Sequence, residues 1–186
     1  MITSLDKNTA LILIDLQKGI VGFPLAHPIA DILGNSAKLV AAFRNAGLPI
    51  VIVNVNPGGA AWTKSRKDPA PAPNAVFKED WLEITPEIKT EADDIFITKH
   101  TWGAFFETAL DDELKKRGVT GIVIGGVSTS IGVEGTARQA SERGYNVTFA
   151  TDAMTDMVAG AHENSQKVIF PRMGETGTTE DIIAKL

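Results

Sequence analysis

Two charged residues stand directly after apolar runs that are typical of buried strands. Asp15 follows Thr9–Ile14, and Lys99 follows residues 95–98. The carboxyl ends of strands in an open α/β sheet meet at the edge where ligands bind, so we expect these side chains to lie together. Partial burial would bring the pKa of Asp15 towards a range useful for acid–base catalysis, and a nearby Lys99 would lower it again. Alternatively, Asp15 caps a turn and Lys99 is solvated, which is common for such residues.

A third candidate is the segment 125–138, which follows an apolar run and opens an alanine-rich helical pattern. It predicts a sharp turn from a buried strand into a helix, which we call the elbow. Such a turn presents backbone N–H groups to a developing negative charge. Gly132 stands where a nucleophile would be expected, and the chain contains no cysteine. The hydroxyls of Ser128, Thr129 and Ser130 are expected to bond the turn backbone or orient a substrate, because a serine becomes nucleophilic only beside a base such as Asp15.

Further apolar runs and helical patterns supply the elements that must position these residues. Additional strands are predicted at residues 49–55, 121–124, 147–150 and 167–170, and helices at residues 29–46, 105–117, 133–143 and 179–186. Strands that alternate with helices favour an α/β fold, a three-layer, doubly wound sandwich with a mostly parallel six-stranded sheet. With 186 residues, the chain is expected to form one domain, residues 1–186.

The composition narrows the classes of partner. A net charge of −5 disfavours nucleic acid and anionic membranes, because both attract basic surfaces. No apolar run approaches the roughly 20 residues needed to span a bilayer. The first residues lack the basic and then apolar pattern of a secretory signal, so we expect a cytoplasmic location. Without cysteine, a disulfide, a thiolate nucleophile and a cysteine-based metal site are all excluded.

The segment 56–80 interrupts the alternation of strands and helices. It contains four prolines, two glycines and a run of alanines. This segment is too long and irregular for an ordinary crossover. It is equally compatible with a functional loop or an oligomer contact and with a passive surface excursion. Trp62, Arg66 and the region of Trp81 are expected to line either the pocket or a subunit contact.

In their order and spacing, these motifs together resemble the isochorismatase-like hydrolase superfamily over nearly the whole chain. The matching segments are residues 13–17, 98–105, 126–137 and 152–156. Most members of that superfamily are amidohydrolases with an Asp–Lys–Cys triad. The resemblance places Asp15 and Lys99 at the first two positions and Gly132 at the cysteine, which excludes thioester chemistry. It also implies a cis peptide bond between Val127 and Ser128 and a homo-oligomer, a dimer or tetramer.

True isochorismatases are similar to this chain in keeping the aspartate and the lysine beside a glycine, and they hydrolyse a vinyl ether. In that reaction a general acid protonates the enol ether carbon, and water adds to the oxocarbenium-like centre. Asp15 would be the acid here, with Lys99 as its charge partner. Those enzymes typically carry an aromatic residue and a histidine where this chain has Ser128 and Ser130, so isochorismate itself is not implied.

The leading interpretation is a hydrolase of a small anionic or carbonyl-bearing metabolite that works without cysteine, metal or cofactor. The alternatives are amide or ester hydrolysis through an elbow serine or an activated water, and a catalytically silent metabolite-binding protein or scaffold. Neither a nicotinamidase-type metal site nor a dinucleotide fingerprint is matched, and His100 is a weak ligand candidate because no second histidine is near it in the sequence. The residues expected to bind substrate are Gln17, Phe23, Trp81, Trp102, Val127, Ser128, Thr129, Ser130 and Ile131.

Overall fold

The structure is a computed structural model that describes residues 2–64 and 77–186. Six strands form one sheet in the order β3-β2-β1-β4-β5-β6, and every neighbouring pair is parallel. The strands are β1 (Thr9–Ile14), β2 (Ile50–Val55), β3 (Ile95–Lys99), β4 (Gly121–Val127), β5 (Asn146–Thr155) and β6 (Gly174–Gly177). The central strands β1 and β4 are buried along their whole length, which explains their unbroken apolar sequences.

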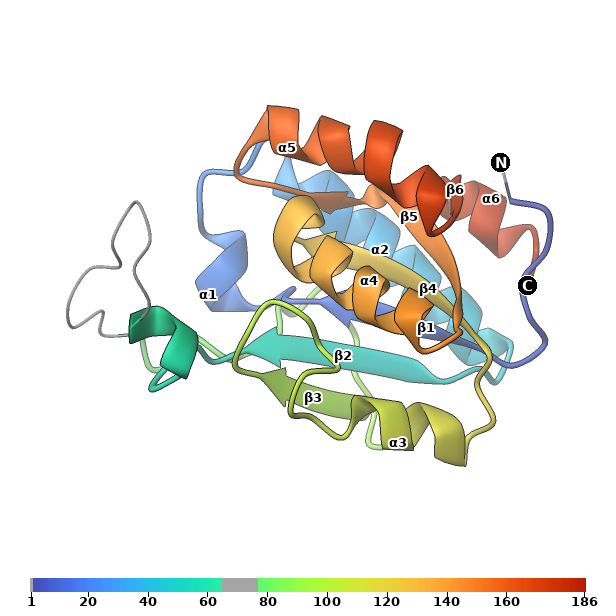
Figure 1. Cartoon of the computed structure of the whole chain (residues 1–186), viewed down its shortest axis with the longest axis horizontal. Coiled ribbons are helices and arrows are strands. Elements are labelled where there is room, and N and C mark those ends of the chain that lie inside the picture. Colours follow the sequence, from blue (N-terminus) through green and yellow to red (C-terminus); the bar gives the residue numbers. More distant parts are fainter. Residues whose placement is uncertain (1, 65–76) are drawn as a thin grey trace.

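Helices cover both faces of the sheet (Figure 1). One apolar cluster joins a sheet face to α2 (Ile29–Asn45) and α6 (Thr179–Ile183), and a second joins the opposite face to α3 (Leu110–Lys116) and α4 (Glu134–Glu142). The predicted three-layer α/β sandwich is therefore confirmed. Short elements complete the chain, namely α1 (Lys18–Val21), α5 (Ala159–Asn164), 3₁₀ turns at Ala61–Lys64 and Phe170–Arg172, and π turns at Thr129–Val133 and Ser165–Ile169.

The strand order creates a switch point between β1 and β4. From β1 the chain moves outward through β2 to β3, and it then returns to the other side of β1 with β4. Helices on opposite faces leave a crevice at the carboxyl ends of such a pair of strands, where ligands of open α/β sheets bind. Asp15 follows β1, and the elbow begins in the last three residues of β4 and continues beyond it, so the topology places both beside this crevice. The labelled chain ends lie at the opposite side of the molecule (Figure 1).

The predicted strand at residues 167–170 is wrong. Those residues belong to the π turn Ser165–Ile169 and the 3₁₀ turn that follows it, and the sixth strand is Gly174–Gly177. The apolar run has a different cause, because Phe170 is fully buried and stacks on Phe149 with ring centroids 3.8 Å apart. A core contact made by a turn produces the same short apolar pattern as a strand.

The predicted helix at residues 105–117 begins only at Leu110. The residues before it form turns, because the N–H groups of Ala104 and Phe105 donate to Thr136 Oγ1 and Gln139 Oε1 on α4. The strand predicted at residues 147–150 instead continues to Thr155. Within the segment 56–80, residues 65–76, and with them Arg66, lie outside the described residues.

Candidate active site

Asp15 and Lys99 form a buried ion pair at the carboxyl edge of the sheet. Lys99 Nζ lies 2.8 Å from Asp15 Oδ2, although the two residues are 84 positions apart in the sequence. Only 5% of Asp15 and 2% of Lys99 are exposed. A pair this well shielded from water keeps its geometry only if further groups hold each partner in place. The alternative that Lys99 is a solvated surface residue is therefore wrong.

The Asp15 carboxyl is poised between its two protonation states. Burial raises its pKa to about 6, and the charge and hydrogen bond of Lys99 keep the pKa from rising further. The second carboxyl oxygen, Oδ1, is buried and has no hydrogen-bond partner among the described residues. The backbone of Asp15 has a φ of 53°, in the left-handed region that aspartate tolerates better than most residues. The site thus holds a carboxyl that can give or take a proton near neutral pH.

A chain of hydrogen bonds links Lys99 to the elbow. Lys99 Nζ donates to the carbonyl oxygen of Thr101 at 3.1 Å. Three residues after Thr101, the N–H of Ala104 donates to Thr136 Oγ1, which itself donates to the carbonyl oxygen of Gly132 at 2.7 Å. The segment after β3 is therefore fixed to the helix that follows β4. This tie sets the position of the ammonium relative to Gly132.

Gly132 lies where β1 and the elbow come closest. A Cβ atom built on Gly132 would stand 2.8 Å from Ile14 Cγ2 and 3.4 Å from Asp15 Oδ2. The first distance is shorter than real Cβ contacts, and Ile14 is fully buried. Gly126 is restricted in a similar way, because it has a φ of 119° and any Cβ there would collide with the Ile14 carbonyl. The peptide bond between Val127 and Ser128 is cis, as the resemblance implied.

Two of the three elbow hydroxyls are engaged away from the ion pair. Thr129 Oγ1 is 2.8 Å from His162 Nδ1 in a buried contact. Both the N–H and the hydroxyl of Ser130 donate to Asp156 Oδ2, each at 2.8 Å. The expectation that Thr129 and Ser130 bind substrate is therefore not supported by their contacts. They fix the elbow to β5 and α5 instead.

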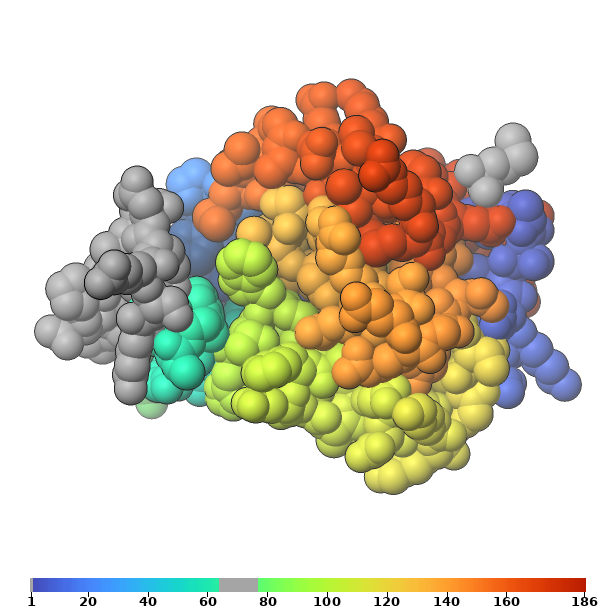
Figure 2. Space-filling view, viewed as in Figure 1, coloured from blue at the N-terminus to red at the C-terminus, as the bar shows by residue number. Residues whose placement is uncertain are grey.

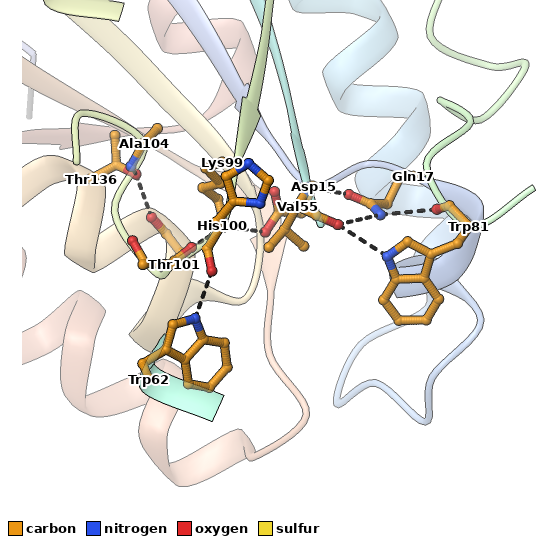
Figure 3. A network of polar contacts seen from close by, with 11 residues as sticks. Asp15, Gln17, Val55, Trp62, Trp81, Lys99, His100, Thr101, Ala104 and Thr136 are labelled. Carbon is orange, nitrogen blue, oxygen red and sulfur yellow. Dashed lines mark hydrogen bonds and ion pairs between the residues drawn. The ribbon is translucent and has the colours of Figure 1, made fainter. Parts of the chain in front are cut away.

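Gln17 was also expected to bind substrate, but it is fully buried and connects three segments. Its Nε2 donates to the carbonyl oxygens of Val55 and Trp81, and its Oε1 accepts from the Val55 N–H at 2.6 Å. The Trp81 indole N–H also donates to the Val55 carbonyl at 3.0 Å. Figure 3 shows this group on one side of Asp15, with Lys99 on the other. Gln17 thus positions Trp81 rather than contacting the cavity.

A second tryptophan is held on the side of Lys99. The Trp62 indole N–H donates to the His100 carbonyl oxygen at 2.6 Å (Figure 3). His100 Nδ1 in turn lies 2.6 Å from the carbonyl oxygen of Asn56. In Figure 2 the segment after β3, in yellow-green, lies between the teal turn Ala61–Lys64 and the orange α4. His100 therefore orders the wall of the site. In the part of the chain that the structure describes, no group of three or more His, Cys, Asp or Glu residues could hold a metal ion.

A cavity of about 230 Å³ opens over the ion pair. Nine of the twelve residues expected at the site line it, namely Asp15, Phe23, Trp81, Lys99, Trp102, Val127, Ser128, Ile131 and Gly132. Gln17, Thr129 and Ser130 do not. Trp62, which was expected to line either the pocket or a subunit contact, lines the cavity. Six further lining residues were not anticipated, namely Ile20, Leu25, Val55, Pro57, Thr101 and Met157. The supporting residues Thr136, Asp156 and His162 were also missed as parts of the site.

A signal in the sequence could have identified one of these supporting residues. β5 ends at Thr155, so Asp156 follows its strand just as Asp15 follows β1. Polar residues at positions 151 and 152 interrupt the apolar run and hide that continuation. His162 had no such signal, because its partner Thr129 is 33 positions away. The described residues include no helix both long and apolar enough to cross a membrane.

Comparison with known proteins gives consistent results. Residues 9–181 match the family model described as the isochorismatase domain. The chain is 41% identical over 182 residues to the uncharacterized isochorismatase family protein YwoC of Bacillus subtilis, covering 97% of this chain and 95% of that protein. It is 28% identical to the ureidoacrylate amidohydrolase RutB of Variovorax paradoxus, covering 95% and 81%. An isochorismatase family protein from Burkholderia thailandensis has a similar structure, with a TM-score of 0.93, 36% identity and coverage of 100% and 99%.

Proposed function

The chain belongs to the isochorismatase family, and from that membership we propose that it hydrolyses a small metabolite without a cysteine nucleophile. In this proposal Asp15 is the general acid or base and Lys99 is its charge partner. Gly132 stands at the position at which most relatives in the wider superfamily carry the cysteine. The observation that carries the proposal is the buried Asp15–Lys99 pair, which faces the cavity beside Gly132.

The first step would use Asp15 as an acid. The protonated carboxyl transfers its proton to the enol ether carbon, and the ether oxygen stabilises the cation that forms on the neighbouring carbon. Water adds to that carbon and returns one proton to the Asp15 carboxylate, and the resulting hemiketal separates into an alcohol and a carbonyl compound. Lys99, 2.8 Å from Oδ2, stabilises the carboxylate between the two proton transfers. No covalent enzyme intermediate is needed.

A second candidate reaction is favoured by Asp15 Oδ1, which has no hydrogen-bond partner among the described residues. In its ionised form, this oxygen could accept a proton from a water that attacks an amide or an ester. The ureidoacrylate amidohydrolase among the relatives makes C–N hydrolysis a reasonable reaction class for this route. Ser128 is the elbow hydroxyl on the cavity wall, so it is the serine that a covalent route would use.

The pH dependence of turnover separates the two roles of Asp15. The pKa of its carboxyl is about 6, so a general acid loses activity as the pH rises through 6, whereas a general base gains activity over the same range. We would screen isochorismate, ureidoacrylate and nicotinamide, and then measure kcat/KM from pH 4.5 to 8.5 on any substrate that turns over. Mass spectrometry of the reacting enzyme would reveal an acyl adduct on Ser128.

Asp15→Asn is expected to lower kcat/KM by at least about 100-fold, which is typical for the loss of a general acid or base. Asp112→Asn, the same substitution on the exposed side of α3, is the matched control and should leave kcat/KM unchanged. Full turnover by Asp15→Asn would disprove the acid–base role. Tight metabolite binding without turnover of any substrate would favour the silent binding protein instead.

A further inference from the structure

Two histidines from distant segments meet behind the elbow. His27 lies in the segment between α1 and α2, His162 lies on α5, and their ring centroids are 4.5 Å apart. In Figure 1 the blue segment that leaves α1 rises towards the orange α5. Only 7% of His162 is exposed, whereas His27 is a surface residue. His27 therefore lies on the solvent side of the buried His162 ring.

Each histidine contacts a buried threonine. His162 Nδ1 is 2.8 Å from Thr129 Oγ1 on the elbow, and His27 Nδ1 is 2.9 Å from Thr155 Oγ1 at the end of β5. Both threonines are fully buried. A hydroxyl can accept a hydrogen bond as well as donate one, so each contact survives when its histidine is protonated. A second proton on the pair therefore acts through repulsion between two charged rings rather than through a lost hydrogen bond.

The segment that carries the first histidine also forms part of the cavity wall. Phe23 and Leu25 line the cavity, and the Ala26 N–H donates to the carbonyl oxygen of Asp156 at 2.8 Å. The Asp156 side chain in turn accepts the N–H of Ser130 on the elbow. The wall and the elbow are thus both attached to the end of β5, next to the two histidines.

The charged groups around the pair do not offset two protons. Burial and the charge of His27 lower the pKa of His162, although Asp156 and Glu163 act in the opposite direction. Glu163 is exposed and pairs with Lys167 at 2.8 Å. An exposed, paired carboxylate gives little compensation to a buried charge, because water screens it. Repulsion between two protonated rings consequently remains.

We propose that His27 and His162 form a proton-sensitive clasp, which holds the cavity wall to the elbow at neutral pH and releases it when both rings are charged. In the released state the exposed His27 moves out into water, because its buried partner is fixed within the fold. The segment with Phe23 and Leu25 moves with it and widens the mouth of the cavity. This behaviour does not depend on which reaction the site performs.

The first test is an NMR titration of the full chain from pH 8.5 to 4.5. The chain has three histidines, so every ring can be followed, and His100 serves as the internal control. Two unit charges 4.5 Å apart repel strongly enough, even in water, to weaken proton binding about fivefold. The second proton on the pair should therefore bind at least about fivefold more weakly than the single proton of either His27→Gln or His162→Gln. Identical titration of each ring in the wild type and the variants overturns the proposal.

Hydrogen exchange of assigned amides tests the release itself. Between pH 7.5 and 5.0, the Ala26 and Ser130 amides of the wild type should lose at least about fivefold in protection factor, because the charged pair gains that factor by separating. Amides within α2 are the control and should keep their protection. His27→Gln and His162→Gln should each remove the pH dependence, and either one suffices if the other does not fold. Unchanged protection in the wild type overturns the proposal, and so does a loss that persists in the variants.

Discussion

The contact between Gly132 and Ile14 predicts a specific cost for any side chain at this position. A Cβ on Gly132 would stand 2.8 Å from Ile14 Cγ2. Ile14 lies on β1, is fully buried and cannot move away freely. Overpacking of this kind costs about 1–3 kcal/mol in a close-packed core. Gly132→Ala should therefore lower the free energy of unfolding, and Gly132→Cys, which carries the same Cβ, should do so as well.

The magnitude is best measured against a second glycine. Gly34 lies within α2, and a Cβ there meets no atom within 4 Å. Gly34→Ala should stabilise the protein by about 0.5–1 kcal/mol, because alanine loses less backbone entropy on folding. The same entropic gain partly offsets the overpacking at Gly132. The two alanine variants should consequently differ by about 1–3 kcal/mol, or roughly 2–12 °C in Tm for a protein of this size.

Urea unfolding followed by circular dichroism gives both free energies, and calorimetry gives both Tm values. A double-mutant cycle with Ile14→Ala then tests the cause, because that variant removes Cγ2. The penalty of Gly132→Ala should largely disappear in the Ile14→Ala background, even though Ile14→Ala itself costs about 2–5 kcal/mol. The reasoning is refuted if Gly132→Ala is as stable as Gly34→Ala, or if its penalty is unchanged when Cγ2 is absent.

Three further predictions concern the parts of the fold that support the site. Phe170→Ala should cost about 3–5 kcal/mol in urea unfolding, because it removes a fully buried ring stacked on Phe149; a loss below about 1 kcal/mol would contradict that packing. Thr178→Ala should cost about 0.5–2 kcal/mol, because Thr178 caps α6 in a reciprocal capping box, and Thr178→Ser, which keeps the hydroxyl, should retain most of the stability. Burial and the neighbouring His27 lower the pKa of His162 below its usual 6.5 in the folded protein, so the unfolded chain binds more protons at this residue and the contribution of His162 to stability should fall as the pH drops below 6.5. The change in unfolding free energy from pH 7.5 to 5.5 should be less favourable for the wild type than for His162→Gln, and equal changes would contradict this assignment.

Strands that lie between helices on both faces of the sheet could be predicted from the sequence. β1 and β4 are buried at every position, so each contains an unbroken apolar run. The end of β1, and with it the place of Asp15, was predicted correctly, whereas β4 continues past the predicted residues 121–124 to Val127, because the two glycines after Ile124 do not extend the apolar pattern. Residues 167–170 are not a strand, because a buried turn around Phe170 has the same short apolar pattern as a strand.

The partners of the polar residues could not be read in this way. Gln17 and Trp81 were both predicted to bind substrate. In the structure Gln17 is buried and holds Trp81 by a hydrogen bond, whereas Trp81 forms part of the cavity wall. Ser130 and Ser128 are two positions apart, but only Ser128 faces the cavity. Hydrogen bonds between distant segments decide such differences, and their partners, such as Asp156, follow no local period.

The sequence by itself determined the α/β class, the sheet edge at which Asp15 and Lys99 lie and the absence of a cysteine, because apolar periodicity and residue identity are local properties. Only the tertiary structure decided that the two charges meet at 2.8 Å in a buried pair, and that Ile14 occupies the space beside Gly132. The physical reason is that desolvation, charge pairing and close packing depend on segments 84 or more than 100 residues apart. No sequence pattern within one segment shows which distant segment it will contact.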